Sequence, residues 1–379
     1  MRLNWNAYYA VLFLYRCIFS VLGQTVVMRL TSIPDTQSYQ SHGIGYVAYA
    51  TSQMSFEPGL AMQQQATLVT AIVGATFSFL GGGNPILINI GFQTIAFIGL
   101  WRMLTALEPD IRKYCAVLVM LPSFTVWSSI ASKEAIVVFL VGMVARYVID
   151  IYRGRGRLRA HHILWFGLLY VFKPHFTPAI MFLILVPIVA RWSRQPAAIA
   201  VGAGLVSLIP LYLLRDTVDR YVLRVVHSVY AEPGGSTRDE RIISQAYDFF
   251  ANAPQGMFRA FMGPTLSEVS SGILHLMSFT ESVLVVGIIL MYVVPRLPRL
   301  PAYLAVVSFF TVFWVLLPNY PLGIANPGTA VRYRTDWLLL IYLATVFLCS
   351  RGVYTAWRAP TMRVVRVEAP QQAVVPQAS

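Results

Sequence analysis

The residues most able to do chemistry in this chain are charged groups at the ends of long apolar runs. The segment IPDTQSYQ (33–40) follows the first apolar run directly, so the carboxylate of Asp35 is expected at the edge of that run. An acid in this position can act as a general base on an acceptor hydroxyl, and Tyr39 on the same segment is a candidate substrate contact. The alternative is structural, because an aspartate that precedes a helix satisfies free backbone N–H groups as an N-cap. Both interpretations of Asp35 remain open here.

A lysine and a glutamate stand together where another apolar run is interrupted. In LPSFTVWSSIASKEA (121–135), Pro122 breaks the run, and Lys133 and Glu134 precede the next one. The adjacent charges either neutralise each other at a membrane edge or place an ammonium over a lipid-linked phosphate. Both residues are therefore candidates for substrate binding, with charge neutralisation as an equally good alternative.

A second interruption reads Lys173-Pro174-His175 and follows the apolar run 163–172. As a helix, that run would cover about 15 Å of a hydrocarbon core about 30 Å thick. Such half-helices are tolerated only where the break is buried in protein or lines a wet cavity. Because the break carries two ionisable side chains, Lys173 and His175 are predicted to belong to a substrate site.

The segment NPGTAVRYRTDW (326–337) contains three further candidates: Arg332, Tyr333 and Arg334. Arginines outside the membrane oppose the positive-inside bias and need a partner. Guanidinium groups bind phosphate bidentately, so this pair suits a phosphate or diphosphate group. The alternative is an internal salt bridge to Asp336 or Asp35. The anionic ligand is favoured because Asp336 alone cannot satisfy both arginines.

Composition indicates the environment of these residues. Of the 379 residues, 57% are hydrophobic and 12% are charged, against about 45–50% and 25% in ordinary globular domains. Such a surplus cannot be hidden in a water-soluble core of this length, so apolar surface must face lipid. The net charge of +13 comes from short stretches between apolar runs, where cations act as topology signals. A nucleic-acid-binding protein would instead gather them in a soluble basic domain, and the sequence contains no Walker-type or dinucleotide-binding motif.

The sequence predicts an all-α transmembrane bundle of about ten spans, some of them short and broken. The basic stretch RGRGRLRAHH (153–162) fixes the cytoplasmic side, because arginines beside a span resist translocation. If every apolar run crossed, Arg112 and Lys113 would share a side with segment 31–63. The conflict is resolved if the run 64–80, which ends in three glycines, forms an interfacial or re-entrant helix in the first external loop. Both termini are then cytoplasmic.

The remaining organisation is one transmembrane domain over residues 1–350, with three external loops: 31–84, 215–275 and 318–335. The second loop is rich in charges of both signs and is expected to form amphipathic helices; its weaker site candidates are His227, Glu232 and Glu268. Arg16 and Glu281 lie in or near spans and are candidates for pairing in the bundle or for lining the cavity. The tail 351–379 is predicted to be basic, then disordered, and cytoplasmic.

Several of these motifs together resemble bacterial membrane proteins of cell-surface polysaccharide assembly. They are an aspartate after the first span in a D-[ST]-x-x-Y setting (Asp35 to Tyr39), PSFTVWSS followed by KE, a mid-chain KPH, the external APQG and the late NPGTAVRYR. The layout is similar to that of glycosyltransferases of the GT-C class and of Wzy-type or EpsG-type polysaccharide polymerases. The resemblance covers most of residues 30–350.

The resemblance implies transfer of a sugar from a polyprenyl phosphate or diphosphate carrier, at the periplasmic face of a bacterial inner membrane. Asp35 would be the base that activates the acceptor hydroxyl. Arg332 and Arg334 would stabilise the departing phosphate, and Lys133, Lys173 and His175 would assist with carrier or sugar contacts. No metal or other cofactor is expected beyond the lipid-linked donor.

The partners expected on this interpretation are a lipid-linked sugar or oligosaccharide, membrane lipid and other polysaccharide-assembly proteins, with no nucleic acid. The alternative function is a transporter or flippase for a lipid-linked or anionic solute, which would use the same arginines and broken spans as a binding site. Such transporters usually carry paired broken helices in two related halves, and this sequence shows no such pairing.

Overall fold

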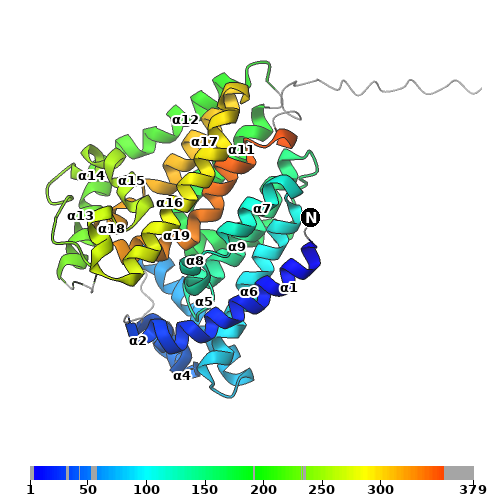
Figure 1. Ribbon diagram of the computed structural model, residues 1–379. Coiled ribbons are helices and arrows are strands. Elements are labelled where there is room, and N and C mark those ends of the chain that lie inside the picture. The colour runs from blue at the N-terminus through cyan, green and yellow to red at the C-terminus, as the bar shows by residue number, and fades with distance from the viewer. Residues whose placement is uncertain are drawn as a thin grey trace, which may run out of the picture.

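The computed structural model describes residues 4–30, 34–41, 43–52, 58–190, 193–231, 233 and 236–353. These residues form helices joined by short connections, and no strand occurs among them (Figure 1). The predicted all-α class is therefore confirmed. Glu232 and nearly all of the predicted tail, from residue 354 onward, lie outside the described residues.

The first half of the chain contains helices of very different length. In order they are α1 (Trp5–Leu22), the π-helical turn η1 (Gly23–Val27), α2 (Met28–Leu30), α3 (Pro34–Ser41), α4 (Gly43–Ser52), α5 (Pro58–Leu80), α6 (Pro85–Ala106), α7 (Pro109–Leu118), α8 (Pro122–Trp127), α9 (Lys133–Tyr152), α10 (Ala160–Phe172), the 3-10 turn η2 (Pro174–Phe176) and α11 (Thr177–Ala190).

The second half continues in the same manner. It comprises α12 (Pro196–Leu213), α13 (Arg215–Ala231), α14 (Asp248–Ala251), α15 (Ala253–Met262), the 3-10 helix η3 (Leu266–Ser271), α16 (Ile273–Val293), the 3-10 helix η4 (Val294–Arg299), α17 (Ala302–Leu316), α18 (Tyr320–Ala325), α19 (Pro327–Tyr342) and the π-helical turn η5 (Leu343–Phe347).

Within the part of the chain that the structure describes, five helical stretches are long and apolar enough to cross a membrane: Trp5–Leu30, Pro85–Ala106, Lys133–Tyr152, Pro196–Leu213 and Ile273–Arg299. A sixth span results if α10 and the segment Pro174–Ala190, bent by 118° at their junction, count as one. Large apolar side chains such as Leu205, Val206 and Ile209 on α12 point away from the protein, as lipid-facing residues do. These features indicate a helical membrane protein, whereas the count of ten crossings stays a prediction.

The predicted broken helices are present. The chain breaks at Lys173 between α10 and α11, where Pro174 cannot donate a backbone hydrogen bond. The apolar run that Pro122 was expected to break is also divided, because α7 ends at Leu118 and α8 begins at Pro122.

The segments predicted to be external loops contain several helices. Segment 31–84 contains α3, α4 and α5, and α5 is one unbroken helix of 23 residues. Segment 318–335 contains α18 and the start of α19, which begins at Pro327. In segment 215–275 the expected amphipathic helix is α13, whose buried residues lie on one face: Asp219, Val222 and Val226.

The centre of the bundle is built around α6, α9 and α19. Gly99 of α6 and Gly142 of α9 bring two backbones into contact, because a Cβ atom at Gly99 would lie 2.5 Å from the Cα atom of Phe139. Close approach of this kind is typical of small residues between membrane helices. Helix α19 packs against α9, α8, α17, α15 and α18, so the charged residues of its first turns lie inside the protein. Figure 1 shows α13, α14, α15 and α18 gathered at one side of the bundle.

Candidate functional site

A network of buried polar side chains fixes the turn that leads into α9. Arg16 of α1 donates from Nη2 to the backbone oxygen of Ser128 at 2.8 Å and from Nε to Gln93 of α6 at 3.2 Å. Asn89 of α6 accepts a hydrogen bond from the backbone N–H of Ala131 at 2.9 Å. Unpaired polar groups are costly in a membrane bundle, so these bonds hold the turn firmly. The suggested pairing of Arg16 with Glu281 is wrong, because each has other partners.

This turn places Lys133 and Glu134 in the first helical turn of α9. The hydroxyl of Ser132 accepts a hydrogen bond from the backbone N–H of Ala135 at 3.2 Å and caps the helix. Glu134 is nearly fully buried at the positive end of the helix dipole, where a carboxylate is favoured. Lys133 is half-buried, and among the described residues no carboxylate lies within ion-pair distance of its ammonium.

Arg332 of α19 joins Glu134 to Asp35. Its Nε and Nη2 atoms donate to the two carboxylate oxygens of Glu134 at 2.8 and 3.2 Å, and Nη2 also lies 3.4 Å from Oδ2 of Asp35. The ring of Trp127 lies beside the guanidinium, 5.5 Å from Cζ to the ring centroid. Burial alone would lower the pKa of Arg332, but the carboxylates of Glu134 and then Asp35 outweigh it and raise that pKa.

The three side chains differ in their access to solvent. The side chain of Asp35 is 51% exposed and that of Arg332 is 23% exposed, whereas that of Glu134 is 3% exposed. Asp35 is the second residue of α3, inside its first turn. The carboxylate that can meet a substrate is therefore Asp35, and Glu134 serves to hold Arg332.

Lys173 forms a second ion pair on the same side of α19. Its ammonium lies 2.6 Å from Oδ2 of Asp336 and 4.5 Å from the centroid of the Tyr333 ring. Asp336 is one helical turn after Arg332, so both ion pairs lie along one face of α19. Asp336 is nearly fully buried and holds Lys173 as Glu134 holds Arg332. Lys173, at the break between α10 and α11, therefore lies in the same cluster as Arg332.

Arg334 lies apart from Arg332, so the two arginines are not placed to bind one phosphate group together, as the sequence suggested. Two residues along an α-helix correspond to a rotation of about 200°, so the side chains leave opposite faces of α19. Arg334 is buried; its Nη2 atom lies 3.4 Å from Glu281 and 3.3 Å from Ser123, and Nη1 donates to Ser282. Both arginines therefore form internal salt bridges. Of the two acids suggested as their partners, Asp35 pairs with Arg332, whereas Asp336 pairs with Lys173.

The other two predicted site residues, Tyr39 and His175, lie near the charges of the cluster. Tyr39 is buried, with its ring edge-on to Tyr46 at 5.6 Å, and burial followed by repulsion from Asp35 raises the pKa of its phenol. His175 packs its ring edge-on against Phe176 and lies beside Asn319. Its Nε2 atom is buried and finds no hydrogen-bond partner among the described residues.

Asp35, Glu134, Lys173, Arg332 and Tyr333 are therefore brought together from α3, α9, the α10–α11 break and α19. The Nη1 atom of Arg332 makes no hydrogen bond to any described residue, so the partly exposed guanidinium retains donors for a ligand. No group of three or more His, Cys, Asp or Glu side chains placed to hold a metal ion occurs among the residues described. In this arrangement the exposed carboxylate of Asp35 can accept a proton beside two cations, Arg332 and Lys173, that buried acids hold in place.

Two members of this cluster were not among the predicted site residues. One is Asp336, which lies one helical turn after Arg332 and therefore on the same face of α19. The sequence could have indicated this only if a helix had been expected to begin at Pro327. The other is Trp127, and the sequence alone carries no signal that it contacts Arg332.

Comparison of the chain with models of known protein families, with curated proteins and with solved structures finds no match.

Proposed function

We propose that this protein transfers or polymerises sugars at a membrane surface, using a donor linked to a polyprenyl phosphate or diphosphate. The observation that carries the proposal is the convergence of the half-exposed carboxylate of Asp35 with the cations Arg332 and Lys173 in one cluster. Helices distant in sequence supply these groups, and buried acids orient both cations. Pre-organised cations of this kind stabilise charge that develops on a leaving group.

In the proposed step, an acceptor hydroxyl oxygen bonds to the anomeric carbon of the donor sugar while the bond from that carbon to the phosphate oxygen breaks. Asp35 takes the hydroxyl proton, and the bonding electron pair leaves with the polyprenyl phosphate or diphosphate. Arg332, through the donors it does not give to Glu134, and Lys173 stabilise that departing charge. Arg334 has no part in this step, because Glu281 engages it on the other face of α19.

An apolar groove beside the cluster supports a lipid carrier. It has a volume of about 490 Å³ and is lined by the end of α1 and its continuation, α8, the start of α16 and the start of α19. Leu22, Val26 and Met277 are among its walls. Trp127 lines the groove and also stacks on Arg332, so a hydrocarbon chain in the groove would bring its head close to the cluster.

The substitution Asp35→Asn tests the proposed base. In a host lacking its own copy, the variant is expected to make no cell-surface polymer, while the purified protein binds polyprenyl diphosphate as the wild type does. Asp219→Asn, on α13 and outside the cluster, is the control for substitution of an aspartate. Full-length polymer from Asp35→Asn would rule out the role of base.

The cations are tested separately by binding. Arg332→Ala and Lys173→Arg are expected to weaken binding of polyprenyl diphosphate, the second because the larger guanidinium cannot occupy the place of an ammonium 2.6 Å from Asp336. Lys113→Arg, at a lysine of α7 that packs on the ring of Tyr114 and lies outside the cluster, is the matched control. Unchanged affinity in both cluster variants would refute the phosphate contact.

A second candidate function is transport of a lipid-linked or anionic solute. The observation in its favour is the 118° bend between α10 and α11, with Lys173 at the break, since broken helices line the substrate sites of many transporters. Flipping of a fluorescent polyprenyl-phosphate lipid in proteoliposomes distinguishes the two. Transport that persists in Asp35→Asn would favour this second function.

A further inference from the structure

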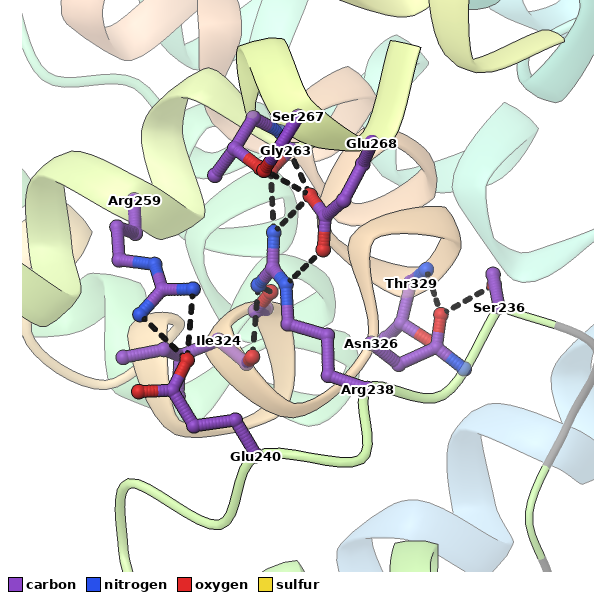
Figure 2. A network of polar contacts seen from close by, with 12 residues as sticks. Ser236, Arg238, Glu240, Arg259, Gly263, Ser267, Glu268, Ile324, Asn326 and Thr329 are labelled. Carbon is purple, nitrogen blue, oxygen red and sulfur yellow. Dashed lines mark hydrogen bonds and ion pairs between the residues drawn. The ribbon is translucent and has the colours of Figure 1, made fainter. Parts of the chain in front are cut away.

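A polar cavity of about 360 Å³ lies outside the Asp35 cluster, in the segment between α13 and α16. Its walls come from residues 236–240, from Arg259 of α15, from the η3 region and from His275 at the start of α16. Figure 2 shows the polar contacts that build this wall. None of these residues takes part in the proposed sugar-transfer step.

The wall of the cavity is held by Arg238, which is nearly fully buried. Its five N–H donors are all engaged: two reach Glu268 at 2.6 and 2.9 Å, and three reach backbone oxygens of Gly263, Gly323 and Ile324 (Figure 2). The backbone N–H of Arg238 also donates to the oxygen of Ala325 at 2.9 Å. An arginine without a free donor cannot grip an anion, so Arg238 is a structural residue.

The remaining charges do not favour an anionic ligand either. Arg259 donates from both Nη atoms to Glu240 at 3.1 and 3.2 Å. The described lining contains three acids (Asp239, Glu240 and Glu268) against two arginines, which leaves one excess negative charge. Phosphate would therefore be repelled, whereas carboxylate oxygens and hydroxyls held in place by these pairs can bond to neutral hydroxyl groups.

The polar cavity adjoins the apolar groove. Ser236, His275 and Pro327 line both of them. The groove is walled mainly by aliphatic side chains, and the cavity mainly by hydroxyl, carboxylate and guanidinium groups. A single ligand that fills both must have a polar end and a hydrocarbon end.

We propose that the cavity and the groove form one binding site for a lipid with an uncharged sugar head. The sugar hydroxyls bond to Ser236, Asp239, Glu240 and Ser267, and the hydrocarbon chain lies in the groove, where it would take the place of the polyprenyl chain of the proposed donor. The excess negative charge of the cavity disfavours an anionic head group. The residues that line both the cavity and the groove favour a ligand with one polar end and one hydrocarbon end. The site needs only binding, so it stands whether or not the Asp35 cluster transfers sugars.

Photo-crosslinking of the full-length protein in phosphatidylcholine nanodiscs tests the site. One probe is dodecyl maltoside with a diazirine on the sugar, and the other is dodecyl phosphate with a diazirine next to the phosphate. The maltoside probe is expected to label the peptides that span 236–241 and 265–275 about tenfold more than the phosphate probe. Equal labelling by the two probes would overturn the proposal.

Two tryptophan substitutions on η3 provide a matched comparison. Ser267 lines the cavity, whereas Ser270 is exposed on the same helix and does not line it. Ser267→Trp is expected to reduce maltoside labelling to background, and Ser270→Trp is expected to leave it unchanged. Labelling that survives Ser267→Trp would show that the sugar head lies elsewhere.

Reversal of the charge balance gives an independent test. The double substitution Asp239→Asn and Glu240→Gln leaves one acid against two arginines and releases Arg259 from its partner. Phosphate-probe labelling at 236–241 is expected to rise to the level of the maltoside probe. If it stays at background, charge does not select the head group and the proposal fails. Because labelling needs no turnover, an inactive but labelled protein would count only against the proposed transfer.

Discussion

Two hydrogen bonds, 2.8 and 3.2 Å long, join the guanidinium of Arg332 to the carboxylate of Glu134, although 198 residues separate them in the chain. The same guanidinium reaches Asp35 over 3.4 Å. One arginine thus has a buried acid that fixes it and a half-exposed acid that faces outward. The two contacts should therefore respond differently to substitution.

Glu134→Gln is expected to lower the free energy of unfolding by about 3–5 kcal/mol, because it leaves a largely buried arginine without its main counter-charge. Asp35→Asn is expected to cost less than about 1 kcal/mol, because its ion pair is exposed, while abolishing activity. Denaturant unfolding in detergent measures both. Equal losses of stability would show that the two acids do not have separate roles.

The double variant Glu134→Gln with Arg332→Gln serves as the control for this pair. Removal of both charges eliminates the unpaired arginine, so the double variant should lose less stability than the two single variants summed. Simple additivity would mean that the pair contributes no mutual stabilisation.

Close packing of α6 on α9 gives a second prediction. Gly99→Ala or Gly142→Ala places a Cβ atom about 2.5 Å from backbone atoms of the opposite helix, which the backbones can relieve only by moving apart. Overpacking of this kind costs about 1–3 kcal/mol. Thermal unfolding in detergent should show both variants less stable than the wild type.

Gly287 of α16 provides the matched control for these substitutions. A Cβ atom there meets no atom within 4 Å, and alanine has the higher helix propensity. Gly287→Ala should therefore be neutral or slightly stabilising. If Gly99→Ala behaves in the same way, the backbones are not in contact at Gly99.

The helical class and the break at Lys173 could be predicted because both depend on local sequence. Apolar runs indicate membrane helices, and a proline after a short run indicates a break. The start of α19 could not be predicted in this way. Its first turns carry Arg332, Arg334 and Asp336, which look like loop residues until partner helices neutralise them.

The residues of the candidate site could be predicted better than the ion pairs that they form. Asp35, Lys173 and Arg332 stand out in the sequence because charges at the ends of apolar runs are costly unless they have a function or a partner. Their actual partners, Glu134 and Asp336, depend on how distant helices pack, which sequence periodicity does not encode. The separation of Arg334 from Arg332 follows only once the segment is known to be helical.

Arg238 gives a third prediction, on the stability of the segment between α13 and α16. Arg238→Met removes five hydrogen bonds: three backbone oxygens lose the donor that Arg238 gave them, and Glu268 keeps only its bonds from Thr265. The expected loss in the free energy of unfolding is about 3–5 kcal/mol. Arg241→Met is the matched control, because Arg241 is exposed and contacts only the ring of Tyr230 among the described residues, and it should cost less than about 1 kcal/mol. Similar losses in the two variants would contradict the structural role of Arg238.

The last prediction concerns pH and the carboxylate of Glu268. Burial alone would raise the pKa of Glu268, but hydrogen bonds from Arg238 and from the backbone N–H of Thr265 outweigh it and lower that pKa to about 2. In the unfolded chain the group has its usual value of 4.5. Its contribution to stability is therefore complete above pH 4.5 and declines as the pH falls from 4.5 towards 2.

The difference in melting temperature between the wild type and Glu268→Gln isolates this group from the other titrating residues. The wild type should be the more stable protein at pH 6, and its advantage should shrink steadily between pH 4.5 and pH 3 as the unfolded state takes up a proton that the folded state does not. Hydrogen exchange of residues 236–268 should accelerate over the same interval relative to the rest of the chain. A melting-temperature difference that stays constant with pH would mean that Arg238 and Thr265 do not hold Glu268 in its ionised form.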